Sequence, residues 1–382
     1  MRLIHFSDTH LGFAESSKVD PVTGLNVREQ DVYRAFAAVI DAALECKLDL
    51  VVHAGDLFHS ARPSNRAIVT ALVGFQRLST AGIPLAVVAG NHSVPRVAAS
   101  GSIFDAWRVL PGIRSAHSGR YEVFEIGDAA VHCVPHVPTE DGLRAALDAL
   151  APRPDKRFNI LVMHAGVEEA DGRFSLAEFN AVNLPSGAID RMGDFDYVAL
   201  GHYHRAMQVA PRVRYSGSTE RLHASEAGYA KGFLEVDLAA GTTIFHRLAP
   251  REILPLPVLP CRGKTPGEVL DALRASLASV PSVEGAIVVV RLEEIDPVAW
   301  IELWRERRDF ERDRLAGAFE VRWEKTFAAA RRGGGGGGPI GSLATEFAAY
   351  MKSAATEGLD RERLRALGER LIAQVLEAEV PS

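Results

Sequence analysis

Short apolar runs alternate with amphipathic segments along roughly the first 245 residues of this 382-residue chain. The runs are rich in Val, Ile and Leu and end in glycine or polar residues, which is typical of buried β-strands. Segments 31–46 and 65–81 repeat their apolar residues at helical spacing, whereas later runs such as 232–236 are hairpin-like. The pattern predicts an α/β fold with a mixed sheet, or with two sheets packed as a layered sandwich, flanked by helices.

The pattern changes near Pro250, where three further prolines within a few residues indicate a linker or the entry to an edge strand. Beyond them, helix-like segments 266–278 and 297–306 alternate with strand-like segments 286–291 and 318–323. This alternation predicts a small α/β domain with its own core.

Residues Gly333–Gly338 are an unbroken glycine run, which is expected to form a flexible linker. Two amphipathic helices are predicted after it, and Asp360 is placed to cap the second. These helices either fold back onto the main body or dock their apolar faces on a partner helix or coiled coil. We therefore divide the chain into segments 1–248, 249–330, 331–339 and 340–382.

Composition and charge exclude few functions. The formal net charge is −6, and it gives no sign of nucleic-acid binding, although a basic groove can sit on an acidic protein. The run Arg305–Arg314 alternates in sign and is interpreted as a solvated helix face, with DNA contact as the alternative. Three widely spaced cysteines disfavour a disulfide framework. No apolar stretch is long enough for a bilayer and Met1 leads directly into a strand, so we expect a cytoplasmic protein without membrane contact.

Five of the strand-like runs end in residues that commonly bind metal ions. A lone Asp at a strand end usually caps a helix, and a lone His is usually a core residue. Five such endings in order favour a shared site, because strands that emerge at one edge of a sheet bring distant residues together. Imidazole and carboxylate ligands without thiolate indicate two manganese, iron or zinc ions and disfavour calcium. The candidate ligands are Asp8, His10, Asp56, Asn91, His164, His202 and His204, with His92 beside them.

These endings resemble the motifs of the calcineurin-like metallophosphoesterase superfamily: Asp8-x-His10, Gly55-Asp56, Gly90-Asn91-His92, His164 and Gly201-His202-x-His204. Finer features resemble the SbcD branch, the nuclease subunit of a double-strand-break repair nuclease–ATPase complex. They are Ser7–Gly12, Gly55–His59, Gly201–His204 and Tyr215–Glu220. The motifs are dense over residues 1–225, and beyond them the likeness rests on the order of a capping α/β domain and a helix pair.

The resemblance implies a layered metallophosphoesterase (nuclease) domain at 1–248 and a role for each site residue. One metal is held by Asp8, His10 and His204, a second by Asn91, His164 and His202, and Asp56 bridges them. Two such ions clamp a phosphodiester and lower the pKa of a water between them. His92 is expected to stabilise the scissile phosphate or protonate the leaving oxygen, and His59 to position the substrate. A helix-capping or surface role is the alternative for His59.

One position departs from the family pattern. The family commonly has an acid after the histidine of Gly-Asn-His, whereas this chain has Ser93. Serine can supply a hydrogen bond but no charge, so either another group takes the acid's role or the leaving-group step is slower. Because all seven proposed ligands are present, we expect an active enzyme, weakened if nothing replaces the acid.

The resemblance further implies a manganese-dependent DNA nuclease, acting as an exonuclease on duplex ends and an endonuclease on single strands. Its partner is an SbcC-like coiled-coil ATPase that binds residues 340–376, and no P-loop in this chain supplies ATP dependence by itself. A homodimer is expected through 65–81, with Leu72 and Phe75, and through 102–110, with Ile103, Phe104 and Trp107. The alternatives are a phosphodiesterase or phosphatase for small phosphoesters, and a catalytically weakened DNA-end-binding subunit.

Overall fold

The computed structural model describes residues 1–46, 48–93, 101–167, 183–185, 187–328, 343–353 and 360–378. Residues Met1–Ala328 form one compact unit, and residues from Ala329 onward belong to a second. The predicted glycine-rich linker at 331–339 lies outside the described residues.

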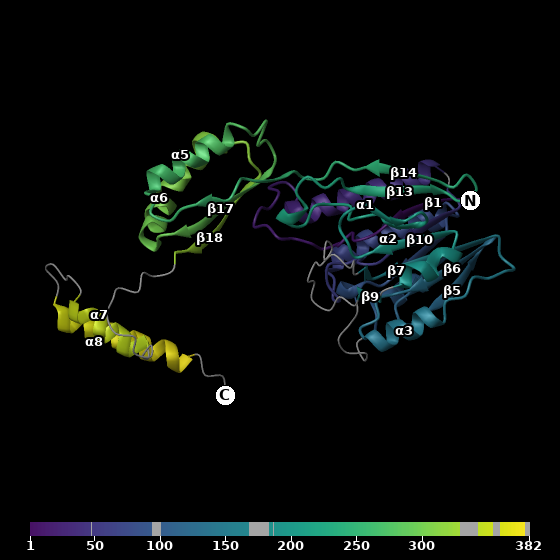
Figure 1. The fold of residues 1–382 in the computed structure, drawn as a ribbon, viewed down its shortest axis with the longest axis horizontal. Helices are drawn as coiled ribbons and strands as arrows, with labels where there is room; N and C mark the ends of the chain where they lie inside the picture. The colour runs from purple at the N-terminus through teal and green to yellow at the C-terminus, as the bar shows by residue number, and fades with distance from the viewer. Residues whose placement is uncertain are drawn as a thin grey trace. The chain divides into compact units, whose positions relative to one another are not determined.

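The first sheet of the larger unit has six strands in the order β14-β13-β1-β2-β3-β4 (Figure 1). Its parallel part comprises β1 (Arg2–Phe6), β2 (Leu50–His53), β3 (Leu85–Val88) and β4 (Ile113–Ala116). The hairpin of β13 (Gly232–Asp237) and β14 (Thr242–Arg247) completes it, with β13 antiparallel to β1. The hairpin-like run predicted at 232–236 is therefore a strand at one side of a mixed sheet.

The second sheet also has six strands, in the order β11-β12-β10-β7-β6-β5. Four are parallel neighbours: β6 (Ala129–Val134), β7 (Phe158–His164), β10 (Tyr197–Gly201) and β12 (Val213–Tyr215). The edge strands β5 (Glu122–Ile126) and β11 (Met207–Ala210) run antiparallel to their neighbours. A separate short pair joins β8 (Gly166–Val167) to β9 (Asn183–Leu184).

The two sheets pack face to face between layers of helices. One buried cluster combines Val52 and Val88 of the first sheet with Val131 and Val162 of the second. The other face of the first sheet packs against α1 (Val27–Cys46), α2 (Asn65–Thr80) and the 3-10 helix η3 (Ile103–Val109). The second sheet packs against α3 (Glu140–Asp148), α4 (Ala188–Arg191) and the 3-10 helix η4 (Met192–Asp194). The predicted α/β fold with mixed sheets and flanking helices is confirmed.

A third, four-stranded sheet follows within the same unit and is entirely parallel. Its strands are β15 (Ile253–Pro255), β16 (Leu259–Pro260), β17 (Ile287–Ile295) and β18 (Glu320–Phe327). They share a core with α5 (Pro266–Leu277) and α6 (Pro297–Arg314). Helix α6 runs eight residues beyond its predicted end at 306, because the alternating charges continue it with pairs such as Arg312–Asp309.

Three of the side chains expected in a dimer interface lie instead in the core. Phe75, Phe104 and Trp107 are fully buried beside one another within the first helical layer. Their apolar spacing therefore reflects packing inside the chain. The exposed large apolar residues of these segments are Val69, Val73 and Val109.

The second unit contains the predicted helix pair, α7 (Leu343–Ser353) and α8 (Arg361–Ala378). The helices pack on each other, since the Phe347 ring occupies the space that a Cβ at Gly368 would need. Leu367 and Leu371 are 44% and 52% exposed, so part of the apolar stripe of α8 stays on the surface. Among the helices of the described residues, none has the length and apolar character needed to cross a bilayer.

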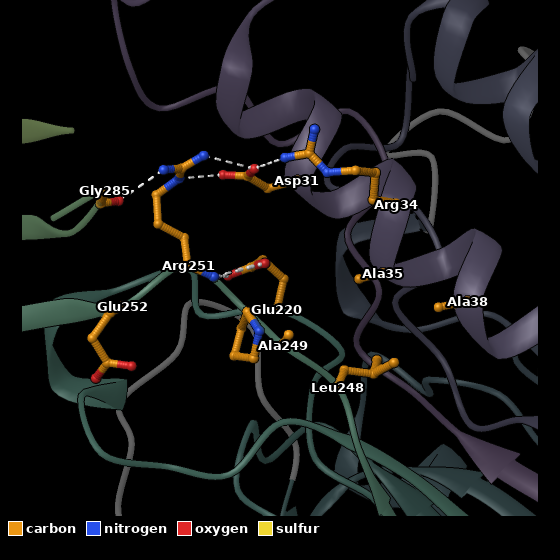
Figure 2. Close-up of a pocket in the computed structure, with 11 residues that line it drawn as sticks. Asp31, Arg34, Ala35, Ala38, Glu220, Leu248, Ala249, Arg251, Glu252 and Gly285 are labelled. Carbon is orange, nitrogen blue, oxygen red and sulfur yellow. Dashed lines mark hydrogen bonds and ion pairs between the residues drawn. The ribbon is translucent and has the colours of Figure 1, made fainter.

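A buried ion-pair network joins α1 to the start of the third sheet. Arg251, just before β15, donates two hydrogen bonds to Asp31 of α1, at 2.6 and 2.9 Å, and a third to the carbonyl oxygen of Gly285 (Figure 2). Arg28 also donates to the Asp31 carboxylate, at 2.7 Å, and so does Arg34 of the same helix. Burial raises the pKa of Asp31, but the Arg251 and Arg28 guanidiniums outweigh it and hold that pKa below its ordinary value. A pocket of about 480 Å³ beside this network contains none of the candidate metal ligands.

Substituting Asp31 by Ala should remove the carboxylate shared by three guanidiniums, those of Arg28, Arg34 and Arg251, of which Arg28 is fully buried. We expect Asp31→Ala to lower the free energy of unfolding by about 3–5 kcal/mol, as measured by denaturant titration. The matched control is Asp41→Ala, whose partner Arg77 is 44% exposed. Asp41→Ala should lower the free energy of unfolding by less than about 1 kcal/mol. Equal losses in the two variants would contradict the role assigned to Asp31.

Candidate metal centre

The seven candidate ligands lie at one edge of the two central sheets. Asp8 and His10 follow β1, Asp56 follows β2 and Asn91 follows β3, where it begins the 3-10 helix η1 (Asn91–Ser93). His164 is the last residue of β7, and His202 and His204 follow β10. Because these strands are parallel within each sheet, their carboxyl ends coincide. Donor atoms within 4.8 Å of one another gather in the sets Asp8, His10, His204 and Asp8, Asp56, His164.

The backbone at this edge adopts conformations that side chains rarely accept. Five described residues other than glycine have a positive φ, and four of them are candidate ligands: Asp8, His10, Asp56 and His202. Main-chain hydrogen bonds hold two of them, because Asp8 donates to the Gly55 carbonyl and His10 to the Asp56 carbonyl, each at 3.0 Å. Such strain collects at functional sites, where the surrounding structure enforces it.

Two glycines let the loops approach closely enough to form the site. A Cβ at Gly55 would overlap the His164 ring, and one at Gly90 would overlap the Asp56 carboxylate. Gly55 also has φ +100°, which an L side chain rarely adopts. The glycines of the Gly55-Asp56 and Gly90-Asn91 motifs are therefore required by the packing of the ligands themselves.

His164 presents a defined ring nitrogen to the site. Its Nδ1 lies 2.9 Å from the Ala54 carbonyl oxygen, which can only accept, so Nδ1 carries the proton. Nε2 then faces Asn91 Oδ1 at 2.9 Å and Asp56 Oδ2 at 3.3 Å. In a neutral ring these three atoms are all electron-pair donors, and such an arrangement requires a proton or a metal ion among them.

A second convergence involves His10 and His204. Their Nε2 atoms lie 3.1 Å apart, and Nδ1 of His204 is 2.9 Å from the Glu226 carboxylate. Since the carboxylate accepts the Nδ1 proton, Nε2 of a neutral His204 carries a lone pair directed at His10. The Asp8 carboxylate lies within the same group of donors.

Electrostatics distinguish two histidines of the site, His164 and His202. Burial raises the pKa of Asp56, but the positive charge of His164 outweighs this effect and holds the pKa well below its ordinary value. For the His164 imidazole, burial acts in the opposite direction and lowers the pKa. The negative charges of Asp56 and Asp8 outweigh burial and raise the pKa of His164 to about 9. At His202, burial, followed by the positive charge of His164, outweighs the opposing charge of Asp56 and lowers the pKa to about 3. A proton on His164 thus supplies, in the protein alone, positive charge that a metal ion would supply.

The donor set fits two divalent ions. Asp56 Oδ2 is buried and, among the described residues, has no hydrogen-bond partner, while Oδ1 accepts from the His92 amide at 3.0 Å. The free oxygen points between the His164 side and the His10 side, at 3.3 and 3.9 Å from their Nε2 atoms. Imidazole, carboxylate and amide oxygen ligands suit manganese, iron and zinc.

His59 and His92 border this donor set. Their rings stack with centroids 5.6 Å apart, and His59 Nδ1 lies 3.4 Å from His10 Nδ1. His92 Nδ1 is 3.2 Å from the carbonyl oxygen of His59, so a main-chain acceptor orients the His92 ring. Ser93 Oγ is buried and makes no hydrogen bond within the described residues.

Sequence reasoning missed the groups that support the ligands. Glu226, in the 3-10 helix η5 (Ala224–Glu226), contacts His204, and the buried Lys231 contacts Glu226 at 2.5 Å. Ser7 donates to Asp8 at 2.5 Å. A lone Glu and a lone Lys have no spacing that distinguishes them from surface residues. Of the supporting groups, only Ser7 and residues Ser216–Thr219 belong to sequence motifs that resemble the family, Ser7–Gly12 and Tyr215–Glu220.

His164 and His202 should titrate at opposite ends of the pH range in the metal-free protein. Because the folded pKa of His164 is raised to about 9, its ring stays charged at neutral pH and loses the proton as pH rises through that value. His202, with a pKa near 3, stays neutral throughout. Ring-proton NMR should resolve both, with His164→Gln and His202→Gln as assignment controls. A His164 ring that titrates near its ordinary value would contradict the proposed contact with Asp56.

The comparisons with known proteins place this site in a family. The model of the calcineurin-like phosphoesterase family matches residues 1–206. The DNA double-strand break repair protein Mre11 of Sulfurisphaera tokodaii is 30% identical over 60% of this chain and 57% of that protein. The protein of the same name from Thermoplasma acidophilum is 30% identical over 66% of each chain. The chain thus spans about six tenths of the length of such relatives.

A solved structure, that of TT1561 from Thermus thermophilus, covers 64% of this chain and 98% of its own, with 15% sequence identity and a TM-score of 0.39. That score is too low to support an assignment, which rests on the family model instead. The matched region includes all seven candidate ligands and more than half of the residues. This chain therefore belongs to the calcineurin-like phosphoesterase family.

Proposed function

We propose that this protein is a manganese-dependent DNA nuclease, acting as an exonuclease on duplex ends and an endonuclease on single strands. The observation that supports the proposal is the gathering of donor atoms from Asp8, His10, Asp56, Asn91, His164 and His204 at one place, where Asp56 Oδ2 has no hydrogen-bond partner among the described residues. Its DNA substrate is supported by the likeness to relatives named DNA double-strand break repair protein Mre11. The ligand chemistry alone does not distinguish DNA from smaller phosphoesters, because it recognises phosphate.

Three residues would hold each ion. Asp8, His10 and His204 form one position, Asn91, His164 and His202 the other, and Asp56 lies between them. When bound, two divalent ions supply the positive charge that polarises a phosphodiester and activates a water. Asp56 would offset the repulsion between the ions, and the neutral Asn91 contributes an oxygen without further negative charge.

The chain's own histidines would handle the substrate. His92 is held by the His59 carbonyl through Nδ1, which leaves Nε2 to contact the phosphate or to pass a proton to the leaving oxygen. His59, stacked on His92, would position the substrate. The His59 carbonyl gives the His92 ring an orientation but no charge, so Ser93 leaves the proton transfer without the acid that the family commonly has.

The helix pair supports an ATPase partner. Leu367 and Leu371 lie one helical turn apart on α8 and are about half exposed, which suits an amphipathic helix docking on a coiled coil. We propose that an SbcC-like ATPase covers this face within residues 340–376. Within the segment 340–376, the structure describes residues 343–353 and 360–376.

The expected homodimer stays a prediction with a narrower surface. With Phe75, Phe104 and Trp107 in the core, it would use the exposed Val69 and Val73 on α2 and Val109 on η3. The two exposed valines of α2 lie four residues apart, on one side of that helix.

Replacing Asp56 by Asn should abolish manganese-dependent cleavage. We expect Asp56→Asn to reduce the cleavage of end-labelled duplex DNA by more than the roughly 10–100-fold that loss of an outer partner costs. Asp41→Asn, the same change at a half-exposed carboxylate, should leave the rate unchanged. Duplex DNA, single-stranded DNA and a small chromogenic diester are compared under the same manganese concentration.

The alternatives give different results in that assay. Turnover of the small diester but of neither DNA form would contradict a nuclease and support a small-substrate phosphodiesterase. Two bound ions without any cleavage would support a weakened end-binding subunit. If Ser93→Asp leaves the rate and pH profile unchanged, this position does not tune catalysis.

Charging the exposed stripe of α8 should disrupt the ATPase complex. In Leu367→Glu/Leu371→Glu, loss of two apolar contacts of about 1.5 kcal/mol each should weaken binding on the order of 100-fold, measured by co-purification and titration. Ala366→Glu is the control, since position 366 is exposed but lies about 100° around the helix from Leu367. Unchanged binding in the double variant would exclude this face as the docking surface.

A further inference from the structure

A buried polar network lies behind His204. The Glu226 carboxylate accepts from Lys231 Nζ at 2.5 Å and faces His204 Nδ1 at 2.9 Å. Lys231 Nζ also donates to the His204 carbonyl and to Ser218 Oγ, each at 2.7 Å. The side chains of Glu226 and Lys231 are 5% and 0% exposed. A buried lysine and glutamate are costly to hold unless fully paired, so their placement behind a metal ligand calls for a function.

Glu226 has little freedom to move. Its Oε1 also accepts from the His223 amide at 3.3 Å, and its Oε2 from the Leu222 amide at 3.3 Å. Main-chain donors and an ammonium thus fix both oxygens, leaving one lone-pair direction for the His204 ring. A carboxylate held in this way fixes the orientation and tautomer of a ligating histidine and raises its basicity.

A second branch of hydrogen bonds reaches Asp8. Ser7 Oγ donates to Asp8 Oδ2 at 2.5 Å and lies 2.9 Å from Ser216 Oγ. Ser216 and Ser218 belong to one short buried segment, so the same piece of chain supports Asp8 through Ser7 and His204 through Lys231 and Glu226. Both Asp8 and His204 belong to the same proposed metal position.

The other position is supported differently. His164 is the end of a strand, and a main-chain carbonyl of the neighbouring sheet, that of Ala54, orients its ring. Among the described residues, the only side-chain carboxylates that contact the His164 ring are those of the proposed ligands. His204 and His164 therefore differ in what orients their rings: a charged network for His204 and a main-chain carbonyl for His164.

We propose that Glu226 is a positioning residue that sets the affinity of one metal position, the one formed by Asp8, His10 and His204. Lys231 and Ser218 hold Glu226 in place for this purpose. The inference rests on the proposed two-metal function. It adds that different residues orient the ligands of the two metal positions, so that the affinity of one position can change without the other.

The test counts bound ions instead of measuring cleavage. Manganese is titrated into the full-length protein, and the free ion is followed by electron paramagnetic resonance. The unaltered protein should bind two ions, whereas Glu226→Gln should weaken one of them by about 10–100-fold and leave the other unchanged. The Gln side chain keeps the shape and the hydrogen-bond acceptor for Lys231 but loses the charge.

Double variants identify the position that is affected. Asn91→Ala should lose the ion on the His164 side, and adding Glu226→Gln should then remove the remaining tight site. Adding Glu226→Gln to His204→Asn should change nothing further, because both act on one position. Ser7→Ala changes the separate branch to Asp8 and should weaken binding of the same ion. It is the substitute variant if Glu226→Gln fails to fold. Circular dichroism of the metal-free variants shows whether each one folds.

The outcomes separate this inference from the proposed function. If the unaltered protein retains no manganese, the two-metal function fails. If it binds two ions and Glu226→Gln binds both with unchanged affinity, or weakens both equally in a folded protein, the positioning role of Glu226 is overturned while the two-metal site stands.

Discussion

Electron-pair donors from two sheets are held together in a buried volume, and the rest of the molecule is organised around this constraint. Asp56 Oδ2, Asn91 Oδ1 and the inward nitrogens of His164, His10 and His204 all face one region. In a buried setting such a set repels itself unless positive charge lies among its members. Left-handed backbone at four of the ligand residues and main-chain bonds between their loops keep the set from relaxing apart.

The architecture explains how such distant residues meet. Parallel strands present their carboxyl ends along one edge, and the face-to-face packing of two such sheets brings a second row of endings against the first. Small residues complete the approach, because Gly55 and Gly90 lie where any side chain would displace a ligand. The site is thus built from sheet geometry, and its loops need only be short.

The proposed chemistry and the proposed partner involve different parts of the chain. The proposed ligand set would recognise phosphate charge, which DNA shares with every other phosphoester. The third sheet, joined to α1 through Asp31 and Arg251, and the helix pair with its exposed leucines lie outside that set. They are the parts through which a nuclease could acquire a long substrate and a partner, and the family of the catalytic core does not by itself decide these properties.

The sequence by itself determined the alternation of strands and helices, two packed sheets as one of two options, and the seven candidate residues at the strand ends. Apolar residues at strand or helix spacing indicate which side chains are buried. Motifs that follow predicted strands indicate which residues lie at one edge of the sheet. The tertiary structure alone decided that Phe75, Phe104 and Trp107 pack inward, because helical spacing does not say which neighbour covers an apolar face. It alone revealed Glu226 and Lys231 behind His204, since a charged pair becomes distinguishable from surface residues only when its burial and contacts are known.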